Sequence, residues 1–409
     1  MGVRRANNQK VLWGERFTRR RVRVGLLVVF ALADATLAFA VMRADGGTPA
    51  PAAVPLHPVT NDFRPDDTQL GVCSDEGCFQ QAFGNVAYRE GPLVALELVD
   101  EVYGNGSDPA CHRVTHIIGA ASLARYKGNV TKTLGAGDST CWSGYYHGVL
   151  ERSLVKAKSR KPDVLAAVSR DLCSDTRLTP WVVYGCLHGL GHGLMIATGL
   201  HLPTSLEVCS RLDRWWDRDA CRGGVFMENI SSSYGFTSIF LKEDDPVYPC
   251  NWVPHGERRR CYQIVTSRIL TFVGDDWKKT AQVCAGVESN FVSWCFRSFG
   301  RDASSRTGRD PAKVAELCAI AREFVAEGDC VEAAAYDITA NFSSASRGKA
   351  LCEAVHSGVR ERCYYGIGIV SGRFEKTDPA RVDRCQALAS DAELVAACVR
   401  GGRENLPRT

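Results

Sequence analysis

Histidines are concentrated in one short part of this 409-residue chain. Five of the nine fall within residues 112–192, and four of these five form two pairs whose members are four residues apart. Two pairs have the pattern H-x-x-x-H and a third has the pattern H-x-x-x-E. Residues four apart lie on one face of a helix, so each pair can offer two donor atoms to one ion. The candidate metal ligands are His112, His116, His147, Glu151, His188 and His192.

A donor set dominated by imidazole nitrogen suits zinc, copper, iron or nickel. H-E-x-x-H and C-x-x-C-H are both absent, so neither the common metalloprotease pattern nor covalent haem attachment is indicated. If the chain is an enzyme, a metal-dependent oxidoreductase or hydrolase is expected, with Glu151 as base and Tyr145 or Tyr146 as proton donor. Two alternatives stay open: histidines that only fill helix contacts and bond to carbonyls, and a metal-free acid–base role.

The histidines are in phase with cysteines. His147 and His192 each lie six residues after a cysteine, and Met227, followed by Glu228, takes the same place after Cys221. Equivalent positions of stacked repeats project from one surface, with neighbouring helices about 8–10 Å apart. We therefore expect the imidazoles to converge on one cluster, with Glu228 or Met227 at its edge.

Cysteine pairs recur about every 34 residues along most of the chain. None of the eighteen cysteines occurs as C-x-x-C, and an even count of this size favours disulfides in an oxidising compartment. Four of them, Cys73, Cys78, Cys111 and Cys141, can form two bonds outside the recurring series. Pairing within a repeat is favoured, and pairing between adjacent repeats is the alternative. The seven recurring pairs are Cys173 and Cys186, Cys209 and Cys221, Cys250 and Cys261, Cys284 and Cys295, Cys318 and Cys330, Cys352 and Cys363, and Cys385 and Cys398.

The repeat pattern predicts an all-α fold of helical hairpins. Asp310-Pro311 and Asp378-Pro379 place a capping residue and a proline at predicted helix starts. The unit around Cys250 contains two prolines and should lack a regular first helix. A glycine three residues after the second cysteine predicts close helix packing; it recurs as Gly144, Gly189, Gly224, Gly366 and Gly401.

The period and the hairpin plan resemble tetratricopeptide-type repeats, and more narrowly the disulfide-stapled helical solenoids of secreted bacterial proteins. The resemblance covers residues 160–402 and concerns architecture, because the Trp, Leu-Gly and Tyr consensus is absent. It implies an α-solenoid with an extended surface for a protein or peptide ligand.

The N-terminus predicts a membrane anchor. Residues 24–42 form an apolar run broken only by Asp34, long enough to span a bilayer. Eight basic residues and Glu15 precede it, a balance of +7 that should keep the N-terminus cytoplasmic and the bulk of the chain extracytoplasmic. A cleaved signal ending near Ala38-Phe39-Ala40 is the alternative.

The predicted organisation follows from these patterns. It comprises a basic cytoplasmic tail (1–23), a transmembrane signal anchor (24–42), a flexible linker (43–69), a helical part with the histidine pairs (70–160), cysteine-paired repeats (161–402) and a tail (403–409). The net charge of the whole chain is +4, and subtracting the +7 of residues 1–23 leaves −3 for the rest. A nucleic-acid partner is therefore not indicated. The expected function is metal binding, and the alternative is a metal-free scaffold for a protein or peptide of the cell envelope.

Overall fold

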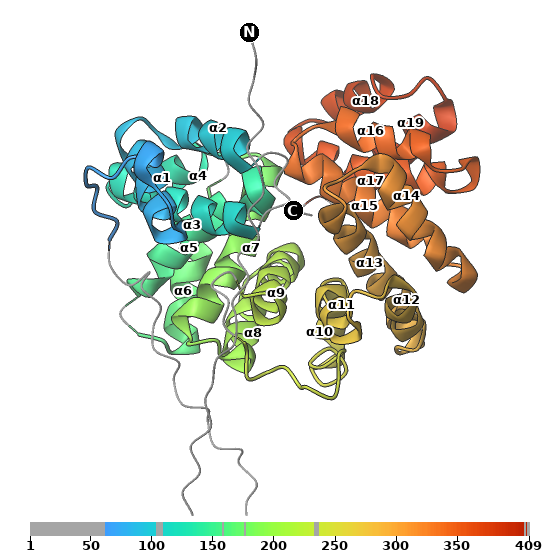
Figure 1. Ribbon diagram of the computed structural model, residues 1–409, viewed down its shortest axis with the longest axis horizontal. Coiled ribbons are helices and arrows are strands. Elements are labelled where there is room, and N and C mark those ends of the chain that lie inside the picture. The colour runs from blue at the N-terminus through green and yellow to red at the C-terminus, as the bar shows by residue number, and fades with distance from the viewer. Residues whose placement is uncertain are drawn as a thin grey trace, which may run out of the picture. The chain divides into compact units, whose positions relative to one another are not determined.

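A computed structural model describes residues 62–103, 109–157, 159–175, 177–232, 237–404 and 406. These residues form helices joined by loops and contain no strand, so the predicted all-α class is confirmed (Figure 1). The helices are α1 (Glu76–Arg89), α2 (Pro92–Tyr103), α3 (Pro109–Arg125), α4 (Val130–Leu134), α5 (Thr140–Val155), α6 (Pro162–Leu172), α7 (Pro180–Ala197), α8 (Leu202–Ser210), α9 (Trp215–Ile230), α10 (His255–Tyr262), α11 (Thr266–Val273), α12 (Trp277–Ala285), α13 (Val292–Arg306), α14 (Pro311–Ile320), α15 (Glu327–Asn341), α16 (Ala345–Ala354), α17 (Ser357–Phe374), α18 (Asp378–Gln386) and α19 (Ala392–Glu404). Three 3₁₀ turns, Leu70–Val72, Ser289–Phe291 and Ala321–Phe324, complete the described elements.

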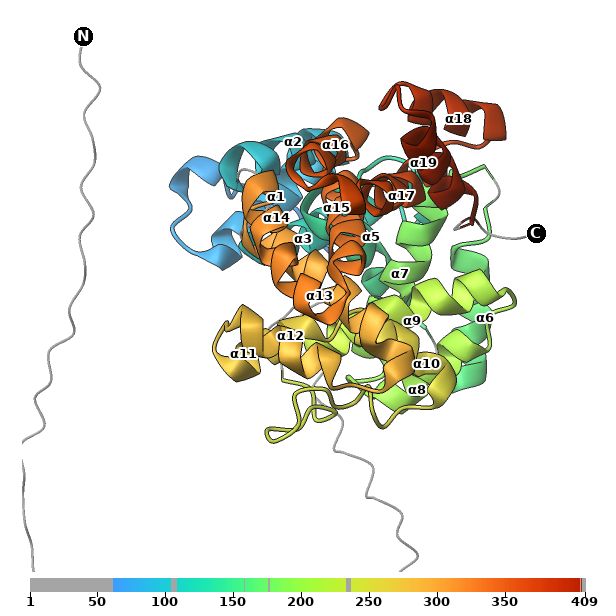
Figure 2. The same ribbon diagram turned by 90° about the vertical axis from the view of Figure 1, so that its right-hand side faces the viewer.

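The longer helices stack in chain order and form an inner row. Helix α3 packs on α5, α5 on α7 and α7 on α9; farther along, α13, α15, α17 and α19 pack on one another in the same way. Shorter helices such as α6, α8, α14 and α16 lie beside this row, as Figure 2 shows for the C-terminal repeats. This is the repeated helical-hairpin plan that the cysteine period predicts.

Every one of the eighteen cysteines is in a disulfide. The recurring pairs bond within their own repeats, as predicted. Six of the seven bonds join a shorter helix, or the residue that ends it, to the following inner helix, and the seventh joins Cys250 in a loop to Cys261 on α10. In these bonds Cys173 is joined to Cys186, Cys209 to Cys221, Cys250 to Cys261, Cys284 to Cys295, Cys318 to Cys330, Cys352 to Cys363, and Cys385 to Cys398.

The remaining four cysteines form the two further bonds that the even count predicts. Cys73 is joined to Cys78, and Cys111 is joined to Cys141. Pairing between adjacent repeats, the alternative for the recurring series, is not observed at any of its seven pairs. Bonds that close loops of 11 to 13 residues stabilise a fold by about 3 kcal/mol each in the chain-entropy model. The pairing indicates an oxidising, extracytoplasmic environment.

The recurring glycines lie where neighbouring inner helices touch through their backbones. A methyl group on Gly224 would overlap the carbonyl oxygen of His188, and one on Gly366 would overlap that of Glu332. The predicted packing role is therefore confirmed. Because only glycine permits this approach, the separation of successive inner helices is set at backbone contact.

Helix starts follow the predicted capping signals in part. Asp310 accepts hydrogen bonds from the backbone N–H groups of Ala312 and Lys313 and begins α14 as predicted. Helix α18 begins one residue earlier than expected, because Thr377 is its N-cap and Asp378 already lies in its first turn. Cys250 lies in a loop, as its two neighbouring prolines predict.

The inner row brings distant repeats together within one compact unit. Helix α5 contacts α15 and α7 contacts α17. Ser139 donates a hydrogen bond to the carbonyl of Ala340, and the backbone N–H of Trp142 donates to Asn341. These contacts place the histidine-bearing helices next to the C-terminal repeats.

The predicted anchor, residues 24–42, lies outside the described residues. Among the described helices, none has the length and apolar character that crossing a bilayer requires. The predicted domain boundaries stay predictions.

Candidate metal centre

Three successive helices of the inner row carry the histidine pairs. His112 and His116 lie on α3, His147 lies on α5, and His188 and His192 lie on α7. Because α3, α5 and α7 pack directly on one another, residues one repeat apart meet across each helix contact. Facing side chains are 35 residues apart for His116 and Glu151 and 36 apart for His192 and Glu228, which is close to the repeat length. The stacked rings of His147 and His192 are 45 residues apart.

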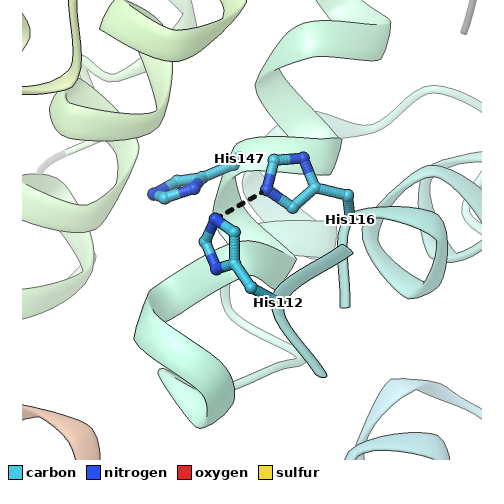
Figure 3. A group of neighbouring side chains, drawn as sticks. All are labelled: His112, His116 and His147. Atoms are coloured by element: carbon cyan, nitrogen blue, oxygen red, sulfur yellow. Dashed lines mark hydrogen bonds between the residues drawn. The ribbon is translucent and has the colours of Figure 1, made fainter. Parts of the chain in front are cut away.

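The first donor set consists of His112, His116 and His147. One ring nitrogen from each lies within 4.8 Å of the others, and Figure 3 shows the three rings turned toward a common point. His116 and His147 are buried, and His112 is partly buried.

The hydrogen-bond partners of the first set fix where its protons lie. Nδ1 of His112 donates to the carbonyl of Cys141 at 2.7 Å, and Nδ1 of His116 lies 3.0 and 3.1 Å from the two carboxylate oxygens of Glu151. A carbonyl or an ionised carboxylate only accepts, so both Nδ1 atoms carry hydrogen. In a pair of neutral rings both Nε2 atoms then carry lone pairs, yet these atoms lie 3.1 Å apart, as the dashed line in Figure 3 marks. Two facing lone pairs repel unless a cation, either a proton or a metal ion, lies between them.

The second donor set consists of His147, His188 and His192, again with one nitrogen from each within 4.8 Å of the others. Nδ1 of His192 donates to Glu228 on α9 at 2.8 Å. That leaves a lone pair on Nε2 of His192, which is buried and has no hydrogen-bond partner in the part of the chain that the structure describes. The His–Glu contact of the first set thus recurs two helices later.

His147 belongs to both sets and has the most unusual surroundings. Its side chain is 0% exposed, and neither Nδ1 nor Nε2 has a hydrogen-bond partner among the described residues. Its ring stacks on that of His192 with centroids 3.9 Å apart, and it meets His112 edge-on at 5.1 Å. A buried polar group without a partner costs about 1–3 kcal/mol, so this ring is destabilising unless something binds it.

Burial keeps the rings of His112, His147 and His188 neutral. It lowers the pKa of His112 to about 3, with the neighbouring His116 adding to the effect. Burial also lowers the pKa of His147 and of His188 well below the ordinary value, and the nearby His192 contributes in both cases. Neutral imidazole is the form that ligates metals, because its lone pair is available.

The other predicted site residues take supporting places. Glu151 belongs to neither donor set and instead holds the ring of His116. Tyr145 and Tyr146 are buried and donate to the carbonyls of Thr133 and Gly137, and burial raises the pKa of both phenols. They are fixed in the helix packing and do not face the donor nitrogens as proton donors.

Sequence reasoning missed a cavity of about 400 Å3 next to the donor sets. His112, His188 and His192 line it, together with Arg259 and Arg260 of α10. The only signal in the sequence is the basic run at residues 258–260, which has no spacing relation to the histidines.

No family model matches this chain, and comparison with curated proteins and with solved structures finds no significant similarity.

Proposed function

We propose that this chain is an extracytoplasmic protein that binds a transition-metal ion (zinc, copper or iron) through its histidine cluster. In this proposal residues 24–42 anchor it to the membrane. The imidazoles of the two donor sets are the ligands, and Glu151 and Glu228 orient His116 and His192 through their Nδ1 hydrogens. Such carboxylate–histidine contacts are characteristic of metal sites, where they fix the ring and raise its basicity.

The observation that carries the proposal is His147. A proton shared between His112 and His116 would remove the repulsion between their lone pairs, but it would leave both nitrogens of His147 without a partner. A metal ion between the rings separates the two lone pairs and also gives one nitrogen of His147 a partner. Ligand nitrogens of a tetrahedral ion with bonds of 2.0–2.1 Å are about 3.3 Å apart, close to the 3.1 Å between the two Nε2 atoms.

Three imidazoles leave one coordination position of a tetrahedral ion for another ligand, as in catalytic zinc sites. Three of the cluster's five histidines also line the cavity, so a small molecule in the cavity can reach that position. Two sets that share one ring can hold one ion each if the ring of His147 loses its N–H proton to solvent and bridges the two ions as an imidazolate.

Elemental analysis of the purified exported domain, residues 43–409, tests the proposal. The expected result is at least one equivalent of zinc, copper or iron, lost in the double variant that combines His147→Ala with His192→Ala. The matched control is His255→Ala, since His255 is an exposed histidine outside the cluster. A folded wild-type protein that carries no metal and takes up none after dialysis against zinc, copper or iron salts supports the rival function, a metal-free scaffold for a protein or peptide.

A further inference from the structure

The cavity beside the donor sets has the size of a small-molecule site. Its volume is about 400 Å3, within the range of typical ligand pockets. Part of its wall is formed by three imidazoles of the cluster. The remainder comes mainly from α7, α9, α10, α13, α15 and α17; the contacts of α5 with α15 and of α7 with α17 bring α15 and α17 alongside.

The wall of this cavity carries an excess of positive charge. Six arginines and three carboxylates line it. The three carboxylates already have arginine partners: Asp302 lies 2.9 Å from Arg301, Glu332 lies 3.1 Å from Arg297, and Asp337 lies 3.6 Å from Arg309. Burial also raises the pKa of the Glu332 and Asp337 carboxyls.

Two of the lining arginines share one carboxylate. Arg259 and Arg260 both donate to Asp219, so this group of three has a net charge of +1. The side chain of Arg260 is only 15% exposed. A positive charge held away from water without full compensation is costly, and an anion in the cavity would offset that cost.

Arg373 and two tyrosines connect this charge to the donor sets. Arg373 is 4% exposed, lies 4.3 Å over the ring of Tyr184 and donates to the hydroxyl of Tyr336 at 3.2 Å. The ring of Tyr184 also stacks on that of His188, with centroids 5.8 Å apart. The ring of Tyr184 therefore contacts both the guanidinium of Arg373 and a predicted metal ligand.

Aromatic side chains make up much of the remaining wall. Tyr184, Tyr336, Trp181 and Trp294 line the cavity. Flat aromatic surfaces next to guanidinium groups suit a planar organic anion better than a small inorganic one, because the ring of the ligand gains stacking area.

We propose that this cavity binds a small aromatic carboxylate. Its carboxylate pairs with Arg260 and Arg373, and its ring packs against Tyr184 and Tyr336. Binding by these side chains is independent of the metal; only the contact of the ligand with a bound ion rests on the proposed function.

Calorimetric titration of the exported domain with benzoate tests the proposal, in chelator and again after loading with zinc. We expect benzoate to bind both forms, and to bind at least about tenfold more tightly than its neutral analogue benzamide or inorganic phosphate. Arg373→Gln should weaken benzoate binding by at least about tenfold, while Arg373→Lys should retain part of it. The matched control is Arg400→Gln, which removes an exposed ion pair with Glu361 and should leave the affinity for benzoate unchanged.

The outcomes separate the two proposals. Benzoate binding in a protein that takes up no zinc, copper or iron supports the carboxylate site and contradicts the proposed metal site. Equal affinity for benzoate and benzamide, equal affinity for benzoate and phosphate, or no benzoate binding in either form overturns the carboxylate site and leaves metal binding intact. The comparison of ligands uses the wild-type protein, so it decides the question even if Arg373→Gln does not fold.

Discussion

Replacing His147 with leucine should stabilise the metal-free protein and abolish its response to metal. The ring is 0% exposed and has two nitrogens without hydrogen-bond partners among the described residues. Each such group costs about 1–3 kcal/mol, whereas leucine has a similar volume and no polar atom. After about 1–1.5 kcal/mol for the change of shape, the free energy of unfolding should rise by about 2 kcal/mol.

The metal response should change in the opposite direction. At a free metal concentration of one hundred times Kd, binding adds about 2.7 kcal/mol to the stability of the wild-type protein. His147→Leu should gain almost nothing, because each donor set then retains only two imidazoles. The variant is thus more stable than wild type in chelator and less responsive in zinc.

Urea unfolding of the exported domain with its disulfides intact, in chelator and in zinc, measures both effects. His255→Leu is the control, since it replaces an exposed histidine outside the cluster. A His147→Leu protein that is less stable than wild type in chelator, and still stabilised by zinc, would refute the reasoning. It would show that the ring serves packing alone.

Three further predictions concern the hydrogen-bond partner of His192, the pH dependence of stability and a disulfide outside the histidine cluster. Glu228→Gln removes the charge that faces Nδ1 of His192 and should weaken metal affinity by about 10- to 100-fold; an unchanged Kd in a competition titration contradicts this role. The metal-free protein should lose stability as pH falls from about 6.5 toward about 3. In this range His112 and His147 bind protons in the unfolded state but stay neutral in the folded state, where burial lowers their pKa. The slope, measured by urea unfolding at several pH values, should be up to about 1.4 kcal/mol per pH unit for each histidine, and a stability independent of pH in this range would count against neutral buried rings. The double variant that combines Cys318→Ser with Cys330→Ser should lower the free energy of unfolding by about 3 kcal/mol yet retain full metal content, because that disulfide lies in α14 and α15; loss of metal would contradict the local role of the bond.

The regular recurrence of the cysteine pairs is enough to predict most of the fold. A spacing of 11 to 13 residues within each recurring cysteine pair suffices to predict a stapled hairpin, and the recurrence of the pairs predicts the stack. The meeting of His116 with Glu151 follows as well, since they are 35 residues apart and the repeat has nearly that length. Local spacing and a fixed period are enough to place residues on adjacent helices.

The cavity could not be predicted in the same way. Arg260 comes from α10, two repeats after α7, and Arg373 comes from α17, five repeats after α7. Arg373 lines one cavity with the histidines because α5 meets α15 and α7 meets α17. That closure depends on small rotations accumulated from repeat to repeat, which no short stretch of sequence specifies.

Because every sulfur of the eighteen cysteines is already oxidised, the proposed centre depends on nitrogen alone. Zinc held by thiolates is released when peroxide converts the ligands to disulfides or sulfenic acids. Imidazole ligands are not open to that reaction, so a centre of this composition can keep its ion under oxidative stress outside the cytoplasm.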